Sequence, residues 1–255
     1  MERTALPGRL NDPGATVTWR LARVTALIDE TAHARTILLD VPAWPGHIAG
    51  QHVDVRLTAE DGYQTERSYS IASAPEDPVV ALTIETIDDG EVSPYLTEEL
   101  RTGDELELRG PFGGYFNWRV RDGGPLLLIA GGSGLVPLMA MLRHRAASSS
   151  AVDARLLLSA RSDADVLYRD ELRELAAADG ATVHYTFTRH PPPGWTGFAR
   201  RIDAEMLAEV GPGPSQVPRI YVCGPTPFVE QAAELLVGLG HAPPAIRTER
   251  FGPTG

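Results

Sequence analysis

Residues 125–137 read PLLLIAGGSGLVP, and they join a short apolar run to a glycine-rich turn and a helical pattern. The apolar run, residues 126–130, is too short for a helix and has the length of a strand that is buried on both faces. Three glycines follow within residues 131–134, and from Leu135 onward apolar residues recur at helical spacing. Free backbone N–H groups at the start of such a helix can bind a phosphate. The segment therefore predicts a nucleotide-binding turn.

The part of the chain before this segment has the alternating pattern of β-strands. Residues 50–57 alternate cleanly between apolar and polar side chains, and Asp61-Gly62 marks a tight turn after them. Short strands at regular spacing are typical of a small antiparallel barrel. We expect six strands in this barrel, over residues 17–24, 36–41, 50–57, 67–71, 79–87 and 105–109.

The part after the segment alternates between strands and helices. We expect strands over 126–130, 153–160, 181–189, 218–223 and 245–251, and helices over 135–145, 167–178, 202–209 and 227–239. This alternation implies a parallel, Rossmann-like sheet with helices on both faces and ligands at the carboxyl ends of the strands. The predicted organisation is a loose arm over 1–15, a six-stranded antiparallel barrel over 16–120 and an α/β domain over 121–255. We expect residues 117–124 to be a polar linker.

The bulk composition excludes several classes of protein. No apolar run approaches the roughly 18 residues of a membrane span, and the N-terminus lacks the apolar core of a signal peptide, so we expect a cytoplasmic protein. A net charge of −11 argues against nucleic-acid binding. The single cysteine cannot hold an iron–sulfur cluster, which needs about four thiolates or two with two histidines. The seven histidines show no metal-ligand spacing, so we expect no metal.

Three motifs in the barrel half carry groups that can bind a cofactor. RSYS, residues 67–70, lies on an expected strand, so its arginine and tyrosine share one face and its serines share the other. GEVS, residues 90–93, leads into a helix that we expect to have Ser93 as its N-cap, which makes a second candidate anion site. GPFGGYF, residues 110–116, is a turn followed by aromatic side chains that can stack on a planar ring or fill the barrel. An ordinary polar strand and an ordinary connecting helix remain the alternatives.

One motif in the α/β half indicates which nucleotide binds. The glycine turn is not the fingerprint GxGxxG, because its last position is Pro137. Ser159-Ala160-Arg161 lies at the end of the second expected strand, where an acidic residue would bind a ribose diol. A hydroxyl and a guanidinium suit a phosphate better, which favours NADP over NAD, and Arg169 could assist. A solvated arginine is the alternative.

Five motifs occur in a fixed order along the chain. They are R-x-Y-S at 67–70, G-x-x-S at 90–93, GGSGLVP at 131–137, C-G-P at 223–225 and E-R-F at 249–251. In this order and at these distances they resemble the ferredoxin–NADP reductase family of flavoproteins. The resemblance covers nearly all of the chain after the first fifteen residues.

The resemblance implies a role for each matching residue on the flavin side. Arg67 would pair with the cofactor pyrophosphate, Tyr69 would lie on the flavin ring, and Ser70 would place its hydroxyl near the flavin N5. Backbone amides of residues 91–93 and the Ser93 hydroxyl would hold the pyrophosphate from the other side. The flavin site then comprises Arg67, Ser68, Tyr69, Ser70, Gly90, Glu91, Val92, Ser93 and Gly110.

On the nucleotide side, the resemblance places the dinucleotide pyrophosphate on residues 131–134. Cys223 would lie beside the nicotinamide, with a small buried core thiol as the alternative. The nucleotide site then comprises Gly131, Gly132, Ser133, Gly134, Ser159, Arg161, Arg169, Cys223, Gly224 and Pro225.

The resemblance also implies a catalytic set at the end of the chain. Glu249 matches a glutamate of the plant-type members, and Phe251 stands where those members end in a tyrosine. The chain continues past Phe251, so the covering of the second flavin face departs from that pattern. The catalytic set is Ser70, Cys223, Glu249 and Phe251.

The function that the resemblance implies is an FAD-dependent NAD(P)H oxidoreductase. Hydride would pass from NADPH or NADH to FAD rather than FMN, and electrons would then pass to a separate ferredoxin-like carrier or oxygenase component. We expect a monomer. Two alternatives stay open, which are a flavin or small-molecule reductase without a protein partner and a non-catalytic flavin- or nucleotide-binding module.

Overall fold

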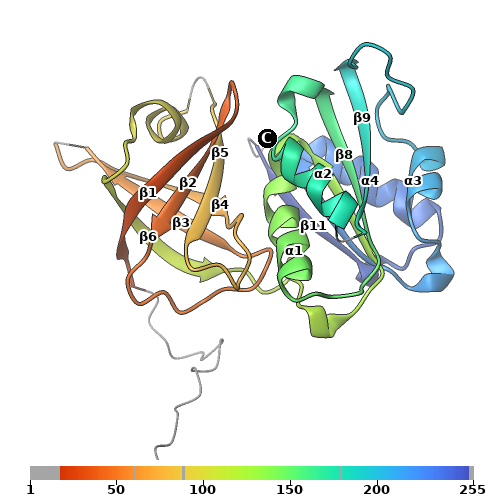
Figure 1. Cartoon of the computed structure of the whole chain (residues 1–255), viewed down its shortest axis with the longest axis horizontal. Helices are drawn as coiled ribbons and strands as arrows, with labels where there is room; N and C mark the ends of the chain where they lie inside the picture. The colour runs from red at the N-terminus through yellow and green to blue at the C-terminus, as the bar shows by residue number, and fades with distance from the viewer. Residues whose placement is uncertain (1–17, 60, 88–89, 179, 253–255) are drawn as a thin grey trace, which may run out of the picture.

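Six antiparallel strands form the first domain of the computed structural model, which describes residues 18–252 except 60, 88–89 and 179 (Figure 1). The predicted arm over residues 1–15 lies outside the described residues. The order in the sheet is β4-β3-β6-β1-β2-β5, and an isolated bridge between Ile71 and Leu82 joins the two ends into a barrel. The strands are β1 (Arg20–Thr31), β2 (Ala34–Asp40), β3 (His52–Thr58), β4 (Gln64–Ser70), β5 (Val80–Glu85) and β6 (Glu105–Phe112).

Five parallel strands form the second domain, in the order β11-β10-β7-β8-β9. The strands are β7 (Leu126–Gly131), β8 (Ala154–Ser162), β9 (Thr182–His190), β10 (Arg219–Pro225) and β11 (Ile246–Phe251). The helices are α1 (Leu135–Ala147), α2 (Arg169–Ala178), α3 (Ala204–Val210) and α4 (Thr226–Gly238). The barrel and the parallel sheet confirm the predicted fold class.

The central strand β7 shows why the sheet needs helices on both faces. All six of its residues are buried. Leu128 packs in one core with α1 and α2, whereas Leu127 and Ile129 pack in another with α3 and α4. Successive side chains of a strand point to opposite faces, so a continuous apolar run requires cover on each side.

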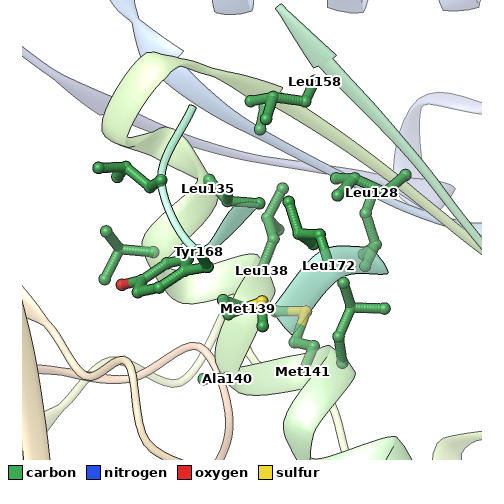
Figure 2. Packing of buried hydrophobic residues seen from close by; sticks show 14 of the residues in the cluster. Leu128, Leu135, Leu138, Met139, Ala140, Met141, Leu158, Tyr168 and Leu172 are labelled. Atoms are coloured by element: carbon green, nitrogen blue, oxygen red, sulfur yellow. The ribbon is translucent and has the colours of Figure 1, made fainter. Parts of the chain in front are cut away.

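Helix α1 is the most deeply buried helix at the junction of the domains. Figure 2 shows Leu138, Met139, Ala140 and Met141 of this helix packed with Leu172 and Tyr168. The same core includes barrel-side residues, namely Ala34, Ala49, Ala72, Ala81, Phe116 and Trp118. The two domains therefore share one apolar core across their junction.

Two expectations about the connection between the domains need correction. Gly110-Pro111 lies inside β6 rather than in a turn, because the strand continues to Phe112 beside β3. Residues 117–124, expected as a polar linker, contain the fully buried Trp118, whose indole N–H donates to the Gly123 carbonyl at 2.9 Å. The expected domain boundary between residues 120 and 121 lies within the short helix η2 (Val120–Asp122) and stays a prediction.

Candidate functional site

The two faces of β4 separate the RSYS residues as the alternation predicted. Tyr69 lies opposite Val53 on β3, whereas Ser70 lies opposite His52. The Ser68 hydroxyl donates to Asp54 at 2.7 Å on the same outer face as Ser70. Tyr69 packs against the barrel core, and this burial raises its pKa to about 12. The tyrosine is therefore a neutral, largely apolar surface at neutral pH.

Arg67 joins the first motif to the second. Its Nη2 lies 3.3 Å from an Oε atom of Glu91, and about half of each side chain is exposed. The structure therefore brings RSYS and residues 90–93 side by side, although Arg67 and Glu91 are 24 positions apart in the chain. A guanidinium carries five N–H donors, so Arg67 can bind an additional anion while it contacts Glu91.

The expected cap on the following helix is wrong. The helix is a single π-turn, η1 (Tyr95–Glu99), without a side-chain cap. Ser93 is buried, and its hydroxyl accepts a hydrogen bond from the Ile87 N–H at 3.0 Å. The hydroxyl therefore binds the backbone of Ile87, and a Cβ at Gly90 would lie 2.8 Å from it.

The glycine turn packs directly against the C-G-P segment. The short helix η3 (Gly132–Gly134) connects β7 to α1. A Cβ at Gly134 would lie 2.1 Å from the Cys223 carbonyl oxygen, and a Cβ at Gly224 would lie 2.9 Å from the ring of Phe228. Side chains are excluded at both positions, so only backbone atoms line this part of the sheet edge. Helix α1 begins there, and the first N–H groups of a helix have no intrahelical acceptor.

Cys223 and Glu249 are register partners on β10 and β11. Cys223 is 2% exposed, and burial, with a further contribution from Glu249, raises the pKa of its thiol well above the usual value. Burial also raises the pKa of Glu249 to about 7. The Oε2 atom of Glu249 is shielded from solvent and has no hydrogen-bond partner among the described residues. An unpartnered buried carboxyl oxygen is the feature expected of a group that contacts a ligand.

The last residue of the expected catalytic set, Phe251, ends β11. Phe251 pairs in register with Pro225, so it lies beside the C-G-P segment at the carboxyl edge of the sheet. Its side chain is 38% exposed. The edge therefore carries Gly134, Cys223, Glu249 and Phe251 together.

The three predicted phosphate-binding residues differ in their contacts. Ser159 is the register partner of Gly131, next to the glycine turn. Arg169 forms an ion pair with Asp163 at 3.1 Å and also donates to the Asp163 carbonyl. The side chain of Arg161 is exposed and makes no hydrogen bond or ion pair within the part of the chain that the structure describes.

Comparison with known proteins identifies both domains. A family model of the oxidoreductase FAD-binding domain matches residues 22–117, and one of the oxidoreductase NAD-binding domain matches residues 128–234. The reductase subunit of glycine betaine monooxygenase from Pseudomonas aeruginosa is 33% identical over 252 residues, which cover 95% of this chain and 68% of that protein. The chain belongs to the ferredoxin reductase-like family of FAD- and NAD-binding oxidoreductases.

Two further family members show how widely the similarity extends. NADH-cytochrome b5 reductase 1 of Aspergillus terreus is 33% identical over 202 residues, which cover 75% of this chain and 67% of that protein. The crystal structure of a cytochrome P450 reductase from Amycolatopsis superposes with a TM-score of 0.82 at 26% identity, over 97% of this chain and 73% of that one.

The residues of this oxidoreductase fit both of its ligands. The glycines at 131, 134 and 224 leave a backbone-lined edge, and the unpartnered Glu249 oxygen lies on the same edge. On the barrel, the half-exposed guanidinium of Arg67 beside Glu91 carries N–H donors of the kind that suits a phosphate group. Among the described residues, no group of three or more histidine, cysteine or acidic side chains could hold a metal, and no helix is long and apolar enough to cross a bilayer.

A polar hollow next to Ser70 was not expected from the sequence. A hollow of about 450 Å³ lies on the outer face of the barrel, lined by His52, Asp54, Arg109 and Phe112. Burial lowers the pKa of His52, and Arg109 pairs with Asp54 at 2.9 Å. The alternation in residues 50–57 already placed His52 and Asp54 on one face, which was the available signal.

Proposed function

We propose that this chain is a reductase that takes hydride from NADPH or NADH onto its FAD and passes the electrons to a separate oxygenase component. One observation carries the proposal. The carboxyl edge of the second domain combines a glycine turn, a neutral buried thiol and a carboxyl with a pKa near 7. The similarity to a monooxygenase reductase subunit over 95% of the chain supports the choice of acceptor.

On the barrel, the proposal assigns cofactor binding to the residues that Arg67 brings together. Arg67 and the backbone of residues 91–93 hold the FAD pyrophosphate, and Tyr69 packs against the flavin ring. When bound, FAD supplies the hydride acceptor and can release electrons one at a time. Ser70 provides a hydroxyl that can hydrogen-bond at the reacting edge of the ring.

On the second domain, the proposal assigns nucleotide binding to the glycine turn. Backbone N–H groups of residues 131–134 hold the dinucleotide pyrophosphate. Cys223, kept as a neutral thiol by burial, lines the place of the nicotinamide and excludes water. Glu249 can hold or release a proton near neutral pH, since its pKa is about 7.

The test of this function is anaerobic mixing of the FAD-loaded protein with NADPH and, separately, NADH. Bleaching of the flavin absorbance by either nucleotide is the expected result. Ser70→Ala should slow this bleaching while FAD stays bound, and Ser215→Ala, an exposed serine in η5 (Pro214–Gln216), should not change it. A protein that binds FAD but is bleached by neither nucleotide would be a non-catalytic binding module instead.

The acceptor needs a separate test, because flavin reduction says nothing about where electrons go. Turnover should be faster with an oxygenase component than with free flavin, and it should change with salt because docking involves charged surfaces. A small-molecule reductase would instead turn over free flavin at least as fast as the protein acceptor, and its rate would not depend on salt. We further propose that the enzyme acts as a cytoplasmic monomer.

A further inference from the structure

Helix α1 connects the two parts of the proposed site. Its N-terminal end is the glycine turn, and near its other end Arg143 donates through Nη1 to the Ala72 carbonyl of the barrel at 2.7 Å. Ala72 lies two residues beyond Ser70 in the chain. The adjacent His144 contacts Glu76 of the same barrel loop, with 2.7 Å between its Nδ1 and a carboxylate oxygen. One helix thus contacts the nucleotide turn and the chain just after Ser70.

The guanidinium of Arg143 is fixed from three sides. Its Nε and Nη2 donate to the two carboxylate oxygens of Glu171 on α2, at 2.7 and 2.6 Å. Its central carbon lies 4.8 Å from the ring centroid of Tyr168. Because the Arg143 side chain is only 18% exposed, this paired and stacked geometry is screened little by water. Arg143 is therefore a rigid connection and not a flexible surface contact.

Tyr168 forms a second connection between the domains. It precedes α2 with a left-handed backbone (φ 52°), and its side chain is 4% exposed against α1 (Figure 2). Its hydroxyl donates to the Thr83 hydroxyl on β5. Its backbone N–H donates to a carboxylate oxygen of Glu30 on β1 at 3.3 Å. A single residue of the second domain thus contacts two barrel strands.

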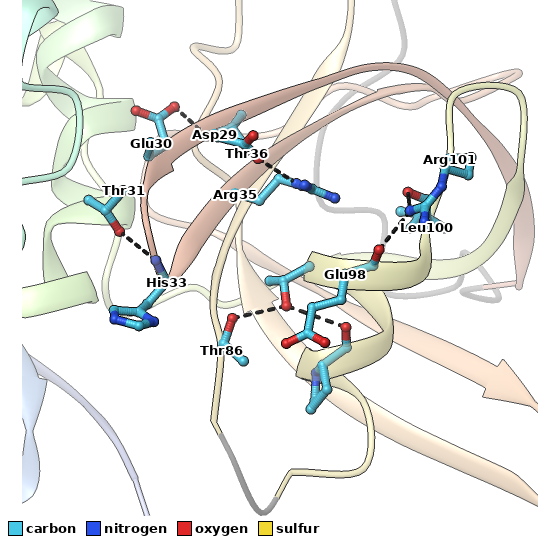
Figure 3. Close-up of polar contacts among 12 residues, drawn as sticks. Asp29, Glu30, Thr31, His33, Arg35, Thr36, Thr86, Glu98, Leu100 and Arg101 are labelled. Carbon is cyan, nitrogen blue, oxygen red and sulfur yellow. Dashed lines mark hydrogen bonds and ion pairs between the residues drawn. The ribbon is translucent and has the colours of Figure 1, made fainter.

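The hydrogen bonds of Tyr168 close into a ring. Thr83 Oγ1 lies 2.7 Å from Thr36 Oγ1. The Thr36 hydroxyl donates to the other oxygen of Glu30 at 2.6 Å (Figure 3). Each hydroxyl in the series has an acceptor, and the series ends on a carboxylate. Fully satisfied buried networks of this kind hold one geometry, since any shift leaves a buried polar group unpaired.

These polar contacts matter because apolar packing does not fill this side of the junction. A hollow of about 580 Å³ lies there, and Glu30, Thr36, Arg143, Tyr168 and Glu171 are among its lining residues. Around the hollow, these hydrogen bonds and ion pairs therefore act together with the shared apolar core to hold the domains at one spacing.

We propose that Arg143 and Tyr168 are positioning residues for hydride transfer. They fix the second domain on the barrel so that the glycine turn and Cys223 face Ser70 in one relative placement. They act through Ala72, Thr83 and Glu30 rather than by contact with the reacting groups. The inference rests on the proposed function, since it takes Ser70 and Cys223 as the two sides of the reaction.

The experiment compares Tyr168→Phe and Arg143→Gln with Arg173→Gln in the FAD-loaded protein. Arg173 is a matched control, because it is on α2 at the same hollow but is 65% exposed and pairs with Asp170 of its own helix. The first measurement is the limiting rate of flavin reduction at saturating nucleotide, together with the KM. The second is the change in the oxidised flavin spectrum on binding NAD+ or NADP+, which reports contact between the rings without turnover.

We expect both variants at the junction to lower the limiting rate by about tenfold or more, since misplacement by about 1 Å can cost about a hundredfold. The KM and the dissociation constant should stay within about twofold, because the nucleotide contacts lie inside the second domain. The flavin spectral change should shrink in both variants. Arg173→Gln should match the wild type in all measurements.

If both junction variants keep the limiting rate and the flavin spectral change of the wild type, the inference is overturned. Losses that are equally large in Arg173→Gln would overturn it too, because these would indicate general loosening of α2. If Arg143→Gln fails to fold, Tyr168→Phe decides the matter, since it removes one hydroxyl. A wild-type protein that neither nucleotide reduces would refute the proposed function, and the spectral change would still test the positioning role.

Discussion

Glu249 combines burial with a missing partner, and this has a consequence for stability as well as for chemistry. Its pKa is about 7 in the folded protein, against an ordinary value of 4.5. Between these values the folded state binds more protons than the unfolded state, so the free energy of unfolding falls as pH rises. The fall is fully developed above about pH 7 and is absent below about pH 4.5. Its size is on the order of 3 kcal/mol at most.

Replacing Glu249 with Gln should remove this pH dependence. Between pH 5 and pH 8, we expect the free energy of unfolding of the wild type to fall by up to about 3 kcal/mol more than that of Glu249→Gln. Urea unfolding with FAD bound measures both values. Parallel pH profiles for the two proteins would show that Glu249 is ionised in the folded state at pH 5.

Arg161 allows a test of nucleotide choice at a single residue. Arg169 pairs with Asp163, whereas the side chain of Arg161 is exposed and has no hydrogen bond or ion pair across the described ranges. We therefore expect Arg161 to bind a 2′-phosphate. Arg161→Ala should lower kcat/KM for NADPH by about 10- to 100-fold, the range for a charge-assisted hydrogen bond of 1.5–3 kcal/mol, and leave NADH unchanged. Equal losses for both nucleotides would place Arg161 outside phosphate recognition.

Some residue-level contacts were predictable and others were not. The faces of RSYS followed from strand alternation alone, which is a local property. The cap at Ser93 failed because its hydroxyl is satisfied by Ile87, six residues earlier, and no local pattern records that choice. The pair of Arg67 with Glu91 depends on two segments meeting in space, so it was equally hidden.

At the scale of an element, the glycine turn needs glycine at position 134 because there is no room for a side chain beside β10. Gly134 has an ordinary helical backbone (φ −58°), which any residue could adopt. Glycine is required there because a Cβ would lie only 2.1 Å from the Cys223 carbonyl oxygen. Gly134→Ala should therefore push η3 away from β10, weaken nucleotide binding at least tenfold and lower the melting temperature.

Gly114→Ala is the matched control, since no atom lies within 4 Å of its Cβ position. Its nucleotide affinity, measured by titration of the FAD-loaded protein, should equal that of the wild type. Wild-type affinity in Gly134→Ala as well would show that the turn can move without harm to the site.

The elements themselves were largely readable from the sequence, and the errors occurred where a strand continues through turn-forming residues. The buried run of β7 and the alternation of β3 predicted both sheets. Gly110-Pro111 carries turn chemistry, yet β6 passes through it because Gly110 packs close to β3, where a Cβ would lie 3.1 Å from Val53. Such packing is a property of the assembled barrel.

At the scale of the whole molecule, the shared core across the junction was not predictable. Trp118 and Ala72 join α1 and β7 in one cluster, although the sequence places them in a linker and a barrel loop. Two independent patterns, one for each domain, carry no information about how the domains pack together. The junction emerges from side chains that neither pattern requires.

A continuous core predicts that the domains unfold together. Leu138 is fully buried in the shared cluster, so Leu138→Ala should destabilise the protein by about 2–5 kcal/mol. In Leu138→Ala, the helical signal in circular dichroism and the flavin fluorescence that reports release of FAD should change at the same denaturant concentration. The two should coincide because damage to α1 is transmitted to the barrel. Leu21→Ala, at a side chain 57% exposed on β1, should shift neither transition by more than about 0.5 kcal/mol. A barrel that retains FAD after the helical signal is lost would mean that the two domains are separate folding units, joined at a surface that contributes little to stability.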